Sequence, residues 1–176
     1  MTPHNTRIRA ATRADFRRVA EIKVANWNDT YAALLEPAVL SRFLDVDQQE
    51  AHLAEQVADG GILLLVADDA VAGVVGFALT HVDARPEPWL ESLHVVRACR
   101  GTGAGTALMR ATAAELLARG RHTLALGVIE GNDAAAEFYD RLGATRAGRE
   151  PATWAAGVWH EIFRWPDLRT LTIPPG

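Results

Sequence analysis

The run from Arg100 to Thr106 (RGTGAGT) contains the residue types and spacing that most directly suggest chemistry in this sequence. It lies between an apolar segment typical of a strand and a segment with helical periodicity. The first N–H groups of a helix have no partner within the helix and carry the positive end of its dipole, so they bind anions. Glycines let a phosphate approach these groups closely. With Arg97 and Arg100 adding positive charge, the run predicts a site for a phosphate-bearing ligand.

Two common nucleotide sites do not fit this run. A Walker loop needs a lysine directly before the Ser/Thr at the helix start, but Gly105 precedes Thr106, and Lys23 is the only lysine among the 18 basic residues. A dinucleotide fingerprint needs G-x-G-x-x-G, and no start within the run places a glycine at the third position. Both kinds of nucleotide chemistry are excluded, while a purely structural glycine turn stays open.

Other catalytic classes have little support. The 6 histidines are scattered, and His160-Glu161 lacks the second histidine of H-E-x-x-H, so we expect no metal. The only serines are Ser41 and Ser92, and neither lies in a G-x-S-x-G motif. Cys99 has no neighbouring histidine to activate it, and we expect it to pack in the core.

These residues need a scaffold, which the hydrophobic periodicity outlines. A strand over 89–96, the glycine run with its helix to residue 119, and a strand over 123–128 form a βαβ unit with parallel strands. The strands before it have short connections and should be antiparallel, which predicts a mixed α/β sheet with helices on both faces. We expect further helices over 16–31, 37–43, 47–58 and 132–142, and further strands over 7–12, 62–67, 71–82, 145–149 and 158–165.

Two sequence elements occur in the order typical of one enzyme family. They are Leu93-His94-Val95 followed by Arg100-x-x-Gly103-x-Gly105, and then Asn132 with Phe138-Tyr139 and Gly143. In this order the chain resembles the GNAT superfamily of acetyl-CoA-dependent N-acetyltransferases. The resemblance covers about residues 7–165 of a single expected domain, 1–176, and implies a central mixed sheet that is splayed. Arg97 and Cys99 stand where the family often has a proline and an aromatic residue, which puts the stiffness of the loop in doubt.

The resemblance also implies how coenzyme A binds. Its pantetheine should pair with the backbone of Leu93, His94 and Val95, where strand 89–96 splays from strand 123–128. Asn132 should contact the coenzyme as well. The residues implied around the pyrophosphate are Gly101, Gly103, Gly105 and Thr106, and Arg100, Thr102 and Ala104 of the same run should also bind the coenzyme.

Acetyl transfer to an amine needs one group to accept a proton and another to supply one. Family members often use the residue matching Tyr139 as the acid that protonates the leaving thiolate; packing against the coenzyme is the alternative role. Asn132 and Tyr139 are about two helical turns apart and should share one face. Phe138 and Leu142 should turn toward the core.

For the base, Glu91 and His94 are the candidates on the strand beside the thioester. Strand alternation places Glu91 with Leu93 and Val95 on one side and Ser92 with His94 on the other, unless a bulge intervenes. We favour Glu91, acting directly or through water, over a role as an exposed strand carboxylate. His94 is the weaker candidate.

Aromatic residues could line the acceptor pocket. Trp27, Thr30 and Tyr31 lie near the end of the first helix, although Trp27 at helical spacing is also typical of a core residue. Trp154 and Trp159 flank a loop that could cover the acceptor, and packing on the strand surface is the equal alternative.

Composition limits the partners. The 176 residues carry a net charge of -4, whereas duplex DNA or an anionic membrane normally selects a strongly basic face. One cysteine forms no intramolecular disulfide, and the polar start lacks a secretory segment, so we expect a cytoplasmic protein. We expect no nucleic-acid or membrane partner, and the last strands could pair across a homodimer.

The expected activity is transfer of the acetyl group from acetyl-CoA, as cosubstrate, to a primary amine by direct attack in a ternary complex. The acceptor is a small-molecule or peptide amine. The alternative is an acyl-CoA-binding sensor or regulatory protein without turnover.

Overall fold

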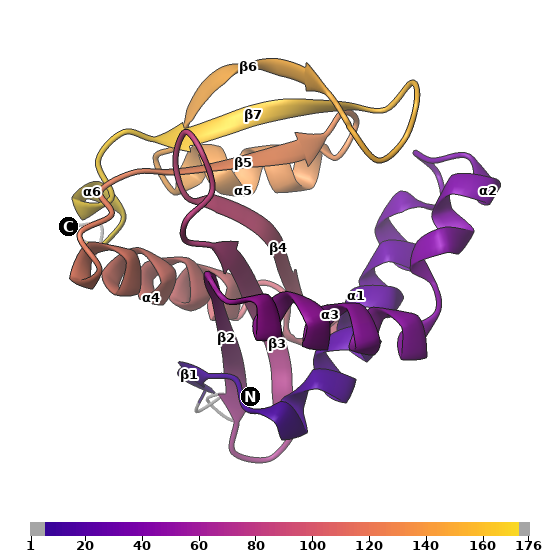
Figure 1. Ribbon diagram of the computed structural model, residues 1–176, viewed down its shortest axis with the longest axis horizontal. Helices are drawn as coiled ribbons and strands as arrows, with labels where there is room; N and C mark the ends of the chain where they lie inside the picture. Colours follow the sequence, from indigo (N-terminus) through magenta and orange to yellow (C-terminus); the bar gives the residue numbers. More distant parts are fainter. Residues whose placement is uncertain (1–5, 173–176) are drawn as a thin grey trace.

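The computed structural model describes residues 6–172, which are built around a mixed sheet (Figure 1). Neighbouring strands are antiparallel except for β4 and β5, which are parallel. The order along the sheet is β1-β2-β3-β4-β5-β7-β6. The strands are β1 (Thr6–Ala10), β2 (Ile62–Asp69), β3 (Gly73–His81), β4 (Trp89–Val95), β5 (Leu124–Ile129), β6 (Thr145–Pro151) and β7 (Trp159–Trp165).

Helices cover both faces of this sheet, as predicted (Figure 1). Helices α1 and α3 pack on one face, and α4 and α5 pack on the other. The α-helices are α1 (Phe16–Tyr31), α2 (Pro37–Leu40), α3 (Val46–Asp59), α4 (Ala104–Ala118), α5 (Asp133–Arg141) and α6 (Arg169–Thr172). Short 3-10 turns span Arg13–Asp15, Ser41–Phe43 and Arg97–Cys99.

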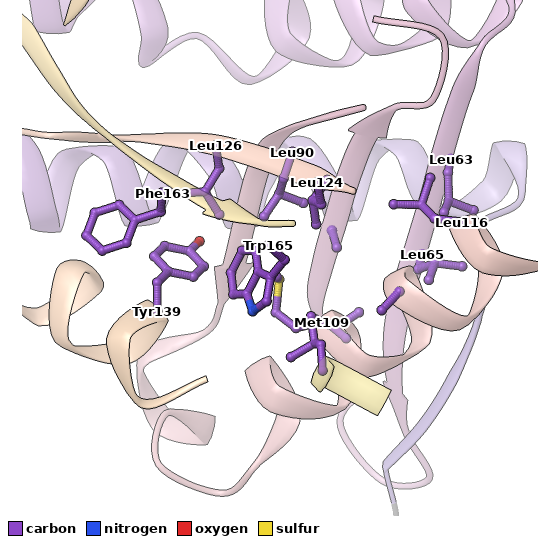
Figure 2. Close-up of a cluster of buried hydrophobic side chains, with 14 of the residues drawn as sticks. Leu63, Leu65, Leu90, Met109, Leu116, Leu124, Leu126, Tyr139, Phe163 and Trp165 are labelled. Atoms are coloured by element: carbon purple, nitrogen blue, oxygen red, sulfur yellow. The ribbon is translucent and has the colours of Figure 1, made fainter. Parts of the chain in front are cut away.

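The buried strand β2 shows how one segment supports two cores. Leu64 and Val66 pack toward α1 and α3, while Leu63 and Leu65 pack toward α4. Successive side chains of a strand point to opposite faces, so an unbroken apolar run is needed when both faces are covered. Figure 2 shows the cluster on the α4 side, where Leu63 and Leu65 meet Leu116 and where β5, β7 and α5 contribute their own side chains.

The sheet divides at its parallel junction. Strands β4 and β5 pair only at Trp89 with Ala125 and at Leu90 with Leu126. Beyond Leu90 the two strands diverge, and Figure 1 shows β5, β7 and β6 running at a steep incline to β2, β3 and β4. The predicted splay is therefore present, and it opens next to the glycine run that precedes α4.

Two surface features bear on partners. None of the helices within residues 6–172 is long and apolar enough to cross a membrane. Strand β6 forms one edge of the sheet, and all of its residues are exposed. An exposed edge is a template for strand pairing, so the homodimer through the last strands stays a prediction.

Candidate active site

A cleft of about 720 Å³ lies where β4 and β5 diverge. Helix α1 closes one part of it, and the start of α4 and the face of α5 close the others. Most of the residues predicted for the site line this cleft. They are Glu91, Leu93, His94, Val95, Arg100, Gly101, Gly103, Gly105, Thr106, Asn132 and Tyr139.

The edge of β4 supplies backbone groups to the cleft. The N–H of Val96 donates to the carbonyl of Val75 on β3 over 2.8 Å. In an antiparallel ladder the direction of the backbone groups alternates, so Leu93 and Val95 point theirs away from β3, toward the cleft. This arrangement leaves the backbone groups of Leu93 and the N–H of Val95 available to an extended ligand, whereas the Val95 carbonyl accepts from side chains.

Asn26, which the sequence analysis missed, braces this edge. Its Nδ2 donates to the carbonyl of Val95 over 3.0 Å, and its Oδ1 accepts from Nη2 of Arg100 over 2.8 Å. The Nε of Arg100 also donates to the Val95 carbonyl, over 3.2 Å. The guanidinium of Arg100 thus ties the loop to α1 beside the cleft. Asn26 lies four positions after the buried Ile22 on α1, and a polar residue on a buried helix face was the signal for its role.

The start of α4 forms the anion end of the cleft. Gly103 caps the helix with φ of 94°, and Gly101 has φ of 77°. Both values fall where residues with a Cβ are strained. The first bond of the helix joins the N–H of Ala107 to the carbonyl of Gly103 over 2.9 Å, so the N–H groups of 104–106 precede the helical ladder. A side chain added at Gly101 or Gly103 would meet no atom within 4 Å, which shows that the loop faces open space.

Two residues of the predicted loop do not line the cleft. The hydroxyl of Thr102 donates to the carbonyl of Cys99 over 2.7 Å and braces the loop. Ala104 packs into the hydrophobic core, as does Cys99. The backbone N–H of Ala104 still belongs to the free first turn of α4, so its predicted contact would be through the backbone.

Helix α5 presents Tyr139 to the cleft, together with Asn132, which caps the N-terminus of the helix. The ring of Tyr139 packs near those of Phe163 and Trp165, at 5.9 and 6.0 Å between centroids, with its hydroxyl on the side of Leu126 (Figure 2). Burial, with a smaller contribution from Tyr31, raises the pKa of Tyr139, so the hydroxyl stays protonated. Phe138 and Leu142 also line the cleft. Both also pack against the hydrophobic core, as predicted.

A β-bulge sets the direction of Glu91. Thr80 of β3 pairs with Leu90, and Leu79 pairs with Ser92, so Glu91 is the extra residue of β4. Glu91 contacts Gln56 of α3 and Lys23 of α1, whereas Leu93 and Val95 pack toward α4. The expected grouping of Glu91 with Leu93 and Val95 was therefore wrong, because the bulge places two successive side chains on one face.

The Glu91 carboxylate is held by three side chains. Its Oε2 lies 2.6 Å from Nε2 of His81 and accepts from Nε2 of Gln56 over 2.8 Å, and its Oε1 lies 3.8 Å from Nζ of Lys23. Burial alone would raise its pKa. The hydrogen bond to His81, the charge of Lys23 and the Gln56 amide outweigh burial and lower the pKa of Glu91 to about 2. The group is thus a fixed carboxylate at neutral pH.

His94 faces the same side as Glu91. Its ring lies 5.4 Å from that of Phe77, measured between centroids. Burial, followed by the positive charges of Lys23 and Arg100, lowers the pKa of His94 to about 3. The wall of the cleft therefore presents a charged carboxylate and a neutral imidazole. Within residues 6–172 no group of three or more His, Cys, Asp or Glu residues is placed to hold a metal ion.

An aromatic cluster of Trp27, Tyr31, Phe43 and Trp154 lies next to the cleft. Trp27 stacks on Phe43 at 4.2 Å and meets Trp154 at 5.7 Å between centroids. Trp27, Thr30 and Tyr31 line the cleft directly. Trp154 instead fastens the loop between β6 and β7 to α1, and the Trp159 ring is covered by the Arg149 guanidinium at 4.1 Å.

Comparison with known proteins agrees with this geometry. A structure of the PaiA N-acetyltransferase from Thermoplasma acidophilum, in complex with coenzyme A, superposes with a TM-score of 0.73 at 18% identity, over 91% of this chain and 98% of that one. A GCN5-related N-acetyltransferase from Rhodopseudomonas palustris gives 0.74 at 22% identity, over 93% and 97%. The yncA protein from Salmonella typhimurium, solved with acetyl-CoA, gives 0.69 at 24% identity, over 93% and 94%.

These structures show the fold, and confirm the splayed mixed sheet that the sequence predicted. No sequence among the curated proteins matches this chain. The sequence model of the acetyltransferase (GNAT) family matches residues 23–144, which include the second half of α1, the splayed strands, the glycine run and α5. The chain therefore belongs to the GNAT family of acetyltransferases.

Proposed function

We propose that this enzyme transfers the acetyl group of acetyl-CoA to a primary amine by direct attack in a ternary complex, and that the acceptor is a small molecule or a peptide. One observation carries the proposal: a single cleft joins the unpaired edge of β4 to the free N-terminus of α4. The coenzyme A and acetyl-CoA in the Thermoplasma and Salmonella structures support it.

The residues of the cleft fit such a substrate. Pantetheine carries amide groups, which the backbone of Leu93 and Val95 can bind as an additional strand would. The N–H groups of 104–106 and the helix dipole suit the pyrophosphate, and the glycines before them keep the approach open. Asn132 also lines the cleft and contributes a polar side chain. We propose that Thr102 acts there only through its backbone. The backbone groups of His94 point to β3, where His94 pairs with Phe77, so His94 would contact the coenzyme through its side chain.

The acceptor must lose a proton before it attacks, because an alkylammonium has a pKa of about 10. With a pKa of about 2, Glu91 is a weak direct base. We infer that it acts through water: the carboxylate orients a water molecule beside the ammonium, this water accepts the proton and passes it to solvent, and the negative charge of Glu91 stabilises the positive charge during the transfer. His94 stays neutral and does not repel the cationic acceptor.

The departing sulfur must gain a proton or be stabilised as a thiolate. Acetyl-CoA supplies a thioester as the acyl donor, and α5 places the hydroxyl of Tyr139 in the same cleft that Glu91 lines. Its raised pKa keeps the proton on the hydroxyl until the sulfur becomes basic. We propose that Tyr139 donates this proton, while Phe163 and Trp165 hold its ring in place.

Two measurements in sequence test the proposal. Calorimetric titration with acetyl-CoA comes first, and an absence of binding at high micromolar concentration contradicts it. Thiol release is then measured over a panel of primary amines, with a blank that lacks amine to account for Cys99. Amine-dependent thiol release is the expected result. Binding without release by any amine would instead support the sensor without turnover.

A further inference from the structure

Lys23, the only lysine of the chain, is buried on α1, and only 16% of its side chain is exposed. Lysine is almost never buried without a partner, because desolvating an ammonium is costly. Its Nζ lies 3.8 Å from Oε1 of Glu91. Burial lowers the pKa of Lys23, and the carboxylate of Glu91 opposes that effect. The anion of the site and this cation therefore stabilise each other.

The contacts of Glu91 come from three elements around the bulge. His81 of β3 and Gln56 of α3 both bind Oε2, at 2.6 and 2.8 Å, which leaves Oε1 for Lys23. A single hydrogen bond would let the carboxylate rotate about its last bond. Contacts to both oxygens fix the plane of the group as well as its charge.

Lys23 also borders a small cavity between α1, α3 and the sheet. This cavity measures about 10 Å³, enough for roughly one water molecule, and its polar lining includes Lys23, Gln49 and Ser92. The Oε1 of Gln49 is buried and has no hydrogen-bond partner within residues 6–172. An ammonium has three donors, so Lys23 can serve Glu91 and this side of α3 together.

On these grounds we propose that Lys23 is a positioning residue for the transfer reaction: it holds the Glu91 carboxylate in one orientation at the wall of the cleft. The inference rests on the proposed function, in which Glu91 assists deprotonation of the acceptor. Lys23 does not line the cleft and acts only through Glu91. Three histidines of the neighbouring elements lie beside this pair. His52 on α3 lines the same small cavity as Lys23, His81 on β3 contacts Glu91, and His94 on β4 interacts with the charges of both.

The kinetic test uses three variants of the full chain. Lys23→Met removes the charge and keeps the length of the side chain, and we expect kcat to fall about tenfold while the Kd for acetyl-CoA changes less than about twofold. Lys23→Arg, which keeps the charge, restores most of the rate. Arg18→Met is the matched control, because it removes a charge from the same helix at a side chain that is 46% exposed and pairs with Glu21; we expect wild-type kinetics.

A double-mutant cycle distinguishes positioning from a separate structural effect. If Lys23 acts through Glu91, Lys23→Met has no further effect on kcat in the Glu91→Gln background. Additive losses, or a full-speed Lys23→Met enzyme, overturn the proposal. The wild-type rate is measured first, so a wild-type protein that turns over no amine refutes the proposed function instead.

The coupling between Lys23 and Glu91 can also be measured without turnover, because Lys23 is the only lysine of the sequence. Labelling with ¹⁵N-lysine gives one side-chain resonance, whose pH titration reports this ammonium alone. Glu91→Gln should lower the titration midpoint by about one pH unit, because burial then acts without the opposing anion. An unchanged midpoint would show that the two groups are not coupled, and would overturn the proposal.

Discussion

Gly103 offers a direct test of the proposed anion site. Matched variants can separate the effect of backbone strain from the effect of a charge placed beside the phosphate. Gly103 caps α4 with φ of 94°, and an added Cβ would meet nothing within 4 Å. Gly120, just past the other end of α4, has φ of 72° and equally open surroundings. Comparing Gly103→Asp with Gly103→Asn isolates the effect of charge, because the two side chains have nearly the same shape. Comparing Gly103→Asp with Gly120→Asp isolates the effect of position, because both glycines have a positive φ and open surroundings.

The magnitudes differ for stability and for binding. Adopting a left-handed backbone costs a residue with a Cβ about 1–2 kcal/mol, which for a chain of this size lowers Tm by roughly 2–8 °C. At Gly103 this cost is partly offset, because Asp and Asn are good N-caps. At about 6 Å from a phosphate charge, a carboxylate repels it by about 0.7–2.8 kcal/mol for an effective dielectric between 80 and 20. That range corresponds to roughly 3- to 100-fold weaker binding.

The assays are calorimetric titration with acetyl-CoA and thermal unfolding. We expect Gly103→Asp to bind acetyl-CoA more weakly than Gly103→Asn by that factor, and the difference should shrink as salt is added. Gly120→Asp should bind as the wild type does, because the 15 residues of α4 separate it from the site by about 22 Å, beyond the Debye length. Equal affinities for Gly103→Asp and Gly120→Asp would refute the assignment of the phosphate to the start of α4.

Three further changes probe the rest of the cleft. Tyr139→Phe should lower kcat by about 10- to 100-fold, with acetyl-CoA affinity within about twofold in calorimetry; an unchanged kcat removes Tyr139 from the acid role. Asn26→Ala should lose about 1–3 kcal/mol in chemical unfolding, because the Val95 carbonyl and Arg100 lose a partner, and it should also weaken acetyl-CoA binding; intact affinity would show that bracing of β4 is dispensable. Glu91→Gln should lower kcat and should reveal a pH-dependent stability difference. The native pKa of Glu91 is depressed to about 2 from 4.5, so the advantage of the wild type is fully present above pH 4.5 and is lost as the pH falls toward about 2. A difference that stays constant down to pH 2 would contradict the ion-pair geometry.

The sequence predicted best those site residues whose positions depend on local structure, such as a glycine turn or the spacing along one helix. Gly101 and Gly103 were predicted to border a phosphate, and both adopt positive φ values beside the start of α4. Asn132 and Tyr139 were placed on one face of a helix by their spacing, and both line the cleft. Local periodicity and capping determine such features, so they can be predicted without knowledge of the tertiary contacts.

The direction of Glu91 could not be predicted in the same way. A bulge between Leu90 and Ser92 depends on how β3 pairs with β4, and that register joins residues far apart in the sequence. Strict alternation would have turned Glu91 toward α4, where Leu93 packs. The bulge instead brings it to His81 and turns it toward α1 and α3.

The same bulge explains why a buried lysine is tolerated on α1. Without the extra residue in β4, no carboxylate would face Lys23 from this strand, and the ammonium would be desolvated with little compensation. Lys23 in turn helps to keep Glu91 ionised and His94 neutral. Two polar residues on the sheet-facing side of α1 therefore contact β4: Lys23 lies against the Glu91 carboxylate, and Asn26 donates to the Val95 carbonyl. In the proposed mechanism, the first contact orients a side chain for the acceptor and the second orients the backbone for the coenzyme. A helix that buries only apolar residues against β4 could cover the sheet, but it could not orient either group.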